Sequence, residues 1–135
     1  MKKITVLLTG MCLISFSSFA GGKFQNVSES EVLPDSAAGT VIRFVKAANS
    51  GEIEKAKTDL SSEYLDWRER FGGIEKHMNY FEEADLSKTF QFRMVAETSN
   101  RAEITVRLFS LPNNAEQNYR IYVSKIGESW KITRK

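Results

Sequence analysis

Residues 119–135, YRIYVSKIGESWKITRK, alternate apolar and polar side chains on both sides of a turn. A repeat of two residues is typical of a β-strand with one buried face. Gly127-Glu128 provides the turn between the two halves, because glycine accepts turn conformations at little steric cost. The stretch therefore predicts an antiparallel hairpin whose buried face carries Tyr119, Ile121, Val123, Trp130 and Ile132.

The same period of two extends upstream to residue 90. One predicted strand places Phe90, Phe92, Met94 and Ala96 on its apolar face and Glu97 on the other. The next, after Ser99-Asn100, directs Ala102, Ile104, Val106 and Leu108 inward. Short connections favour antiparallel pairing, so we expect a four-stranded antiparallel sheet with one apolar face. A one-residue bulge would reverse the facing of part of a strand.

The residues before 85 show helical spacing instead. Asp35 or Ser36 is a candidate N-cap, and residues 38–48 carry apolar side chains three and four apart before Asn49-Ser50-Gly51 ends the helix. A second short helix starts near Ile53, and the aromatic and charged stretch 63–73, EYLDWRERFGG, continues in helical spacing. A third helix is predicted over residues 74–84. Helices that all precede the strands cannot connect parallel strands, so the sequence predicts an α+β fold with the helices on one face of the sheet.

Two segments resemble a known family. "VIRFVKAANSGEIEKAKTDLSSEYL" (41–65) and the closing hairpin (119–135) are similar to the opening and closing segments of small secreted nuclear transport factor two-like domains, a superfamily shared with ketosteroid isomerases and polyketide cyclases. The resemblance spans residues 35–133 and implies a cone of helices and curved sheet, with either a ligand pocket or a filled core inside. It also implies that dimerisation through the outer sheet face is common. A cystatin-like arrangement is the alternative, although the helical segments between residues 52 and 84 favour the first reading.

The segment 1–20, MKKITVLLTGMCLISFSSFA, predicts a signal peptide, with two lysines, an apolar run and a Ser-Phe-Ala cleavage site. The apolar run is interrupted and shorter than the roughly 20 residues of a membrane-spanning helix. We therefore expect residues 21–34 as a polar leader and 35–135 as a single domain. Export to the periplasm is the favoured destination, with release from the cell as the alternative, and no membrane anchor is expected in the mature chain.

Cleavage would change the charge and remove Cys12, the only cysteine. Without Lys2 and Lys3, the 19 lysines and arginines fall to 17, which equals the 17 aspartates and glutamates. A neutral mature chain argues against nucleic-acid binding, which needs a clustered cationic surface. One histidine and no mature cysteine argue against a transition-metal site, and no sequence motif indicates a cofactor.

Candidate site residues lie in the helical half. Tyr64, Trp67, Arg68 and Phe71 combine aromatic and arginine side chains, the types enriched in binding hot spots; the alternative is that the aromatics are core and the charges solvated. His77, with Tyr80 close by, could act as a base or simply be a half-buried histidine with one hydrogen bond. On the outer sheet face, Arg93, Arg107, Phe109 and Tyr122 form either a dimer surface or a solvated face.

We find no acidic side chain among the predicted inward residues, so a general acid or base in the cone is not expected. The leading hypothesis is a non-catalytic binding module for a small apolar ligand or an envelope protein. One alternative is a small isomerase, dehydratase or hydrolase that uses His77 with a carboxylate. A further alternative is a periplasmic inhibitor or immunity-type factor that binds a protein.

Overall fold

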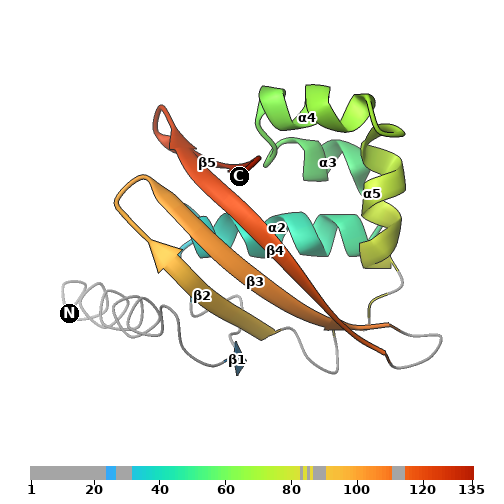
Figure 1. The fold of residues 1–135 in the computed structure, drawn as a ribbon, viewed down its shortest axis with the longest axis horizontal. Coiled ribbons are helices and arrows are strands. Elements are labelled where there is room, and N and C mark those ends of the chain that lie inside the picture. The colour runs from blue at the N-terminus through green and yellow to red at the C-terminus, as the bar shows by residue number, and fades with distance from the viewer. Residues whose placement is uncertain (1–23, 27–31, 83, 85, 87–90, 111–114) are drawn as a thin grey trace, which may run out of the picture.

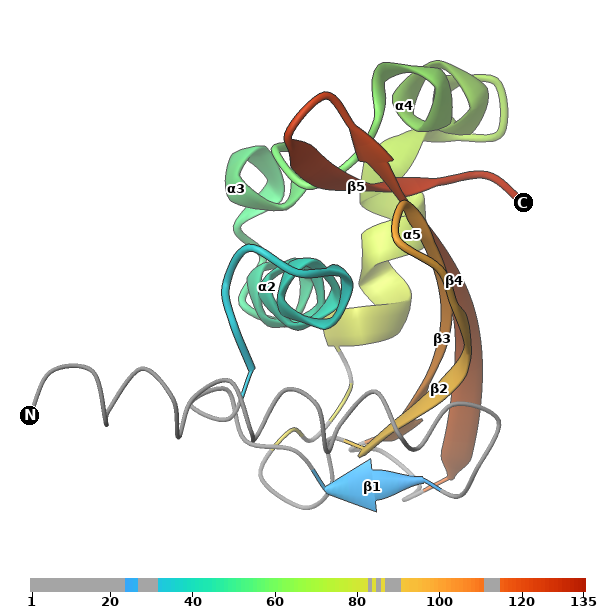
Figure 2. The ribbon, with the colours of Figure 1, turned by 90° about the vertical axis from the view of Figure 1, so that its left-hand side faces the viewer.

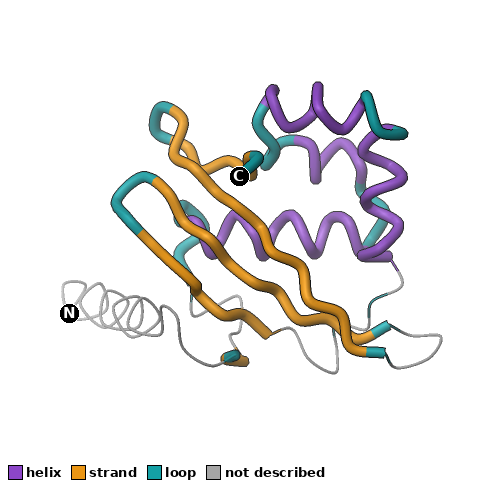
Figure 3. Tube along the Cα trace, in the orientation of Figure 1, coloured by secondary structure: helices purple, strands orange, loops and turns teal. Residues whose placement is uncertain are grey.

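The computed structural model of the chain describes residues 24–26, 32–82, 84, 86, 91–110 and 115–135. The predicted signal peptide and most of the predicted leader lie outside the described residues. Four helices precede four long antiparallel strands, which confirms the α+β class (Figures 1 and 3). The helices are α2 (Ala37–Asn49), α3 (Ile53–Lys57), α4 (Ser62–Glu69) and α5 (Gly73–Glu82). The strands are β1 (Gln25–Asn26), β2 (Gln91–Glu97), β3 (Arg101–Phe109), β4 (Glu116–Ile126) and β5 (Ser129–Thr133).

The strands form one antiparallel sheet in chain order, β1 to β5. Across β3 and β4, Ile104 pairs with Ile121, and across β4 and β5, Val123 pairs with Ile132. Because directly paired residues share a face, these pairs build one continuous apolar surface. Figure 2 shows this curved sheet from its edge, with α2 and α5 on the same side of it.

Helix α2 fills the centre of the core. Ser36 caps its first turn, since the Ser36 hydroxyl accepts a hydrogen bond from the Gly39 amide at 3.0 Å. Val41, Phe44 and Val45 are at most 1% exposed and lie among buried side chains of the sheet and α5. The helix ends at Asn49, and Gly51, which follows the Ser50 cap, has a φ of 72° that favours glycine. The predicted helix and its cap are therefore confirmed.

Strand β5 is held on both sides. It pairs with β4 along one edge, and at its other edge the Ile132 amide donates to the Asp59 carbonyl at 2.7 Å. The Ile132 carbonyl accepts from the Ser61 amide at 2.9 Å. Ile132 is buried, and Trp130 is half-buried and packs against the core, as the alternation predicted. The segment between α3 and α4 thus protects an edge of the sheet that would otherwise be exposed.

Three local features differ from the sequence-based expectation. The short strand β1 adds to β2, where only a polar leader was predicted. Residues 58–61 separate α3 from α4, with Ser61 as the N-cap of α4. The register of β2 shifts between Met94 and Ala96, so Ala96, predicted inward, is exposed and pairs with Glu103. Glu97, predicted outward, pairs with Ala102 of the inner face and is exposed.

Two inward predictions cannot be compared fully, because Phe90 and the side chain of Phe92 lie outside what the structure describes. Within the described residues, none of the helices has both the length and the apolar character needed to span a bilayer.

Candidate functional site

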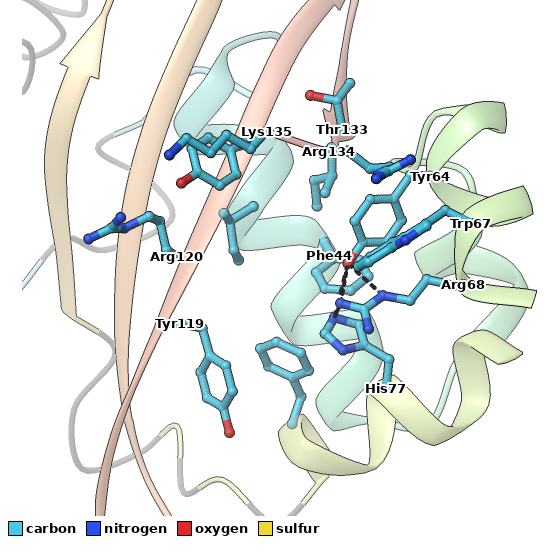
Figure 4. A pocket seen from close by; sticks show the side chains of 14 residues that line it. Phe44, Tyr64, Trp67, Arg68, His77, Tyr119, Arg120, Thr133, Arg134 and Lys135 are labelled. Carbon is cyan, nitrogen blue, oxygen red and sulfur yellow. Dashed lines mark hydrogen bonds between the residues drawn. The ribbon is translucent and has the colours of Figure 1, made fainter. Parts of the chain in front are cut away.

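A pocket of about 410 Å³ lies where the first half of β4, which β5 does not flank, faces the helices (Figure 4). Strand β5 pairs with β4 only from Tyr122 onward, so no described strand lies beside the earlier residues of β4 on that edge. Helices α4 and α5 stand opposite, and residues 132–135 close one end. The lining consists of Phe44, Tyr64, Trp67, Arg68, His77, Phe81, Tyr119, Arg120, Ile121, Tyr122, Ile132, Thr133, Arg134 and Lys135.

The floor of the pocket is apolar and aromatic. Phe44 and Phe81 meet edge to face with ring centroids 5.5 Å apart, and Phe81 lies 5.0 Å from the ring of Tyr119. Ile121 and Ile132 complete the floor from the sheet and are both buried. A floor of this kind favours ligands with an apolar body, since burying apolar surface is the main driving force for binding it.

One polar cluster interrupts this apolar lining. The Arg68 guanidinium donates from Nε and Nη2 to the Tyr64 hydroxyl, at 3.1 and 3.0 Å. The Tyr64 hydroxyl lies 3.2 Å from His77 Nε2, and Arg68 Nη2 lies 3.4 Å from the same nitrogen. Because Arg68 can only donate, His77 Nε2 is the acceptor and Tyr64 donates to it. The ring of His77 is therefore neutral, with its proton on Nδ1.

The local sequence explains how these side chains converge. The Ser61 hydroxyl accepts from the Tyr64 amide at 3.1 Å and starts α4 at that point. Tyr64 and Arg68 are four residues apart, so they lie on the same side of the helix. His77 comes from α5, where Phe81 follows one turn later on the same side. The ring centroids of His77 and Phe81 are 5.6 Å apart.

Burial sets the protonation of the cluster. Desolvation, with a smaller contribution from the Arg68 charge, lowers the pKa of His77 to about 4. Burial raises the pKa of the Tyr64 hydroxyl, although the hydrogen bond and charge of Arg68 oppose that rise. Both side chains are therefore uncharged at neutral pH, and Arg68 is the only charged member of the cluster.

The rest of the charged lining is cationic. Arg68, Arg120, Arg134 and Lys135 contribute to the pocket, whereas no Asp or Glu side chain lies among its described lining residues. Arg120 is offset by Glu103 at 3.5 Å. Trp67 meets two guanidinium groups, that of Arg68 at 4.5 Å and that of Arg134 at 5.0 Å from its ring centroid. The electrostatic character of the pocket is therefore positive.

Four of the residues predicted to bind a ligand or partner meet in this pocket: Tyr64, Trp67, Arg68 and His77. Phe71 does not line it; its ring is tilted against that of Trp67 with centroids 5.5 Å apart, and the residue is 62% exposed. Tyr80 belongs to α5, but its side chain lies outside the described residues. Sequence reasoning missed Arg120 and Arg134 as pocket residues, because their place depends on pairing between segments far apart in the chain.

The predicted dimer surface lies on the sheet face away from the helices. Arg93 pairs across the sheet with Thr105, and Arg107 forms an ion pair with Glu116 at 3.3 Å. The ring of Phe24 covers the guanidinium of Arg107 at 3.7 Å and that of Arg93 at 5.0 Å. Phe109 is half-buried, and Tyr122 lies at the border of the pocket. The dimer remains a prediction, since these contacts lie within one chain.

Two of the described carboxylates lie in a different pocket. Glu97 and Glu103 line a second, smaller pocket of about 240 Å³, which does not include His77. Among the residues that the structure describes, no three His, Cys, Asp or Glu side chains lie close enough to hold a metal ion together. Neither the protein-family models nor the curated proteins compared with this chain give a match.

Proposed function

We propose that this protein is an exported, non-catalytic binding domain, whose pocket between β4 and helices α4 and α5 holds a small, largely apolar ligand. The observation that carries the proposal is the apolar pocket itself, with a volume of about 410 Å³. Small-molecule sites in proteins typically have volumes from roughly 300 Å³ to roughly 1000 Å³, so this pocket is large enough. Membership of the nuclear transport factor two-like superfamily is part of the same proposal; the order of helices before a curved sheet supports it.

A neutral fluorescent naphthalene, N-phenyl-1-naphthylamine, tests the proposal directly. Its emission rises in apolar surroundings, so we expect saturable enhancement on titration with the protein. Trp67→Ala removes a wall of the pocket and should weaken binding about tenfold, as expected for the loss of an aromatic contact. Phe71→Ala is the matched control, because it removes a neighbouring aromatic ring that lies outside the lining.

Equal effects of the two substitutions, or no saturable binding by the folded wild-type protein, would contradict the proposal. Thermal melts of all three proteins confirm that each is folded. The same pair of variants also tests the protein-binding alternative, for which the exposed ring of Phe71 is the favouring observation. If the site binds a protein instead, Phe71→Ala should weaken partner binding more than Trp67→Ala does. The neutral probe should then show no saturable fluorescence enhancement.

The catalytic alternative requires a carboxylate that orients His77. A base also needs a free lone pair, whereas His77 Nε2 already accepts hydrogen bonds from Tyr64 and Arg68. A neutral imidazole with a pKa of about 4 is a weak base, so it abstracts protons poorly near neutral pH. These contacts support binding over catalysis.

A further inference from the structure

The Arg68 guanidinium is only partly satisfied by the protein. Nε and Nη2 donate to Tyr64, but no acceptor for Nη1 is found among the described residues. Arg68 is half-buried, and no carboxylate of the described chain forms an ion pair with it. A cation withdrawn from water without a counter-charge is costly, and an anion next to it would recover that cost.

Three other arginines of the domain form ion pairs with carboxylates. Arg43 pairs with Asp59 at 3.0 Å, and Arg107 and Arg120 pair with Glu116 and Glu103. Arg68 differs from these because its neighbours in the pocket are aromatic rings and uncharged polar groups. Within the pocket, therefore, no described side-chain carboxylate balances the charge of Arg68.

Arg134 extends this positive region to the rim. Its guanidinium packs over the ring of Trp67, and no ion pair with it is found among the described residues. Figure 4 shows the Trp67 side chain between Arg134 and Arg68, in agreement with the two guanidinium contacts of its ring. Guanidinium groups bind carboxylate, sulfonate and phosphate oxygens with matching geometry.

We propose that the ligand of this pocket is an amphiphilic anion, with an apolar ring system on the Phe44, Phe81 and Ile121 floor and an oxyanion held by Arg68. This inference rests on the proposed small-molecule function and specifies its ligand class. The oxyanion completes the hydrogen bonding of Arg68, and Arg134 assists from the rim. The pocket thus selects ligands with a negative charge at the end that meets Arg68, and it tolerates different shapes of the apolar ring system.

Two matched probes separate the anion from the apolar body. The first probe, 8-anilinonaphthalene-1-sulfonate, carries the ring system of N-phenyl-1-naphthylamine plus one sulfonate. Both are titrated against wild-type protein, Arg68→Met, Arg134→Met and Arg70→Met. Arg70 ends α4 outside the pocket, so its substitution removes the same charge without removing a lining residue.

We expect wild-type protein to bind the sulfonate about tenfold or more tightly than the neutral probe, in line with a charge-assisted hydrogen bond. Arg68→Met should abolish this preference while leaving the neutral probe nearly unchanged, Arg134→Met should reduce it, and Arg70→Met should keep it. Competition by 1-naphthoate, 1-naphthyl phosphate and 1-naphthalenesulfonate then ranks the head groups.

The possible outcomes distinguish the anionic ligand from the small-molecule proposal itself. Equal binding of the two probes by wild-type protein, or a preference that survives Arg68→Met, overturns the anion while the small-molecule proposal stands. Failure of both probes overturns the proposed function as well. If Arg68→Met does not fold, the wild-type preference and its reduction in Arg134→Met carry the test, since Arg134 is exposed and outside the core.

Discussion

His77 should make a distinct contribution to the destabilisation of this protein by acid. Its pKa in the folded state is about 4, whereas an unfolded chain would show the ordinary value of 6.5. Between these two values the unfolded chain binds a proton that the folded chain does not, so stability rises with pH across this window and is lost on acidification. At about 1.4 kcal/mol for each pH unit, the loss from above 6.5 to about 4 approaches about 3 kcal/mol, which partial exposure of the ring reduces.

The matched variant is His77→Gln, because the glutamine carbonyl can accept from Tyr64 and Arg68 as Nε2 does but does not titrate. Urea unfolding at several pH values, followed by tryptophan fluorescence, gives the free energy of unfolding for both proteins. Carboxylates contribute equally to both, so the difference between the two pH profiles isolates His77. NMR titration of the single histidine of untagged protein supplies an independent pKa.

The reasoning is refuted if the histidine titrates near 6.5 in the folded protein, or if the two proteins lose stability in parallel on acidification. A parallel loss would place the acid sensitivity in carboxylates. A normal pKa would mean that water reaches the ring and that the Tyr64–Arg68–His77 cluster is open in solution.

Three further substitutions test how the helices and turns are held, each read from urea unfolding. Ser61→Ala removes the cap of α4 and should cost about 1 kcal/mol. The exposed control Ser62→Ala should change the free energy of unfolding by about 0.5 kcal/mol at most. Asn49→Ala removes hydrogen bonds from Nδ2 to the Phe81 and Ala84 carbonyls, at 2.7 and 2.8 Å. It should cost about 1–3 kcal/mol, and a neutral result would mean that water replaces both bonds. Gly127→Ala meets no atom within 4 Å but must adopt a φ of +65°. We therefore expect a loss of about 1 kcal/mol from backbone strain alone, and Gly127→Asn should lose less.

The sheet could be predicted from the sequence wherever one face is apolar and the other polar. In β3 and β4 the alternation is clear, and Ile104, Val106 and Ile121 are buried as predicted. In β2 the apolar residues Met94, Val95 and Ala96 are consecutive, so the pattern does not say which of them changes face. The bulge falls at this point, and the predicted facing of Ala96 and Glu97 fails there.

The candidate site could be predicted only in part, because some of its residues meet within one helix and others meet only through contacts between distant segments. Helical spacing brings Tyr64, Trp67 and Arg68 together within α4, and these were identified from residue type. Their meeting with Arg134 depends on the pairing of β5 with residues 59–61, which no local pattern encodes. Strand β1 is only two polar residues, too short to give a period at all.

The attachment of β5 to the segment between α3 and α4 also bears on the order in which the chain can fold. The Lys131 ammonium donates to the Thr58 carbonyl 73 positions earlier, beside the backbone bonds of Ile132. A nascent polypeptide that still lacks residues 129–135 can form its helices and the β3–β4 hairpin, but it has neither β5 nor one wall of the cavity. Because contacts between distant segments form slowly, we expect the cavity to be among the last parts of the molecule to form.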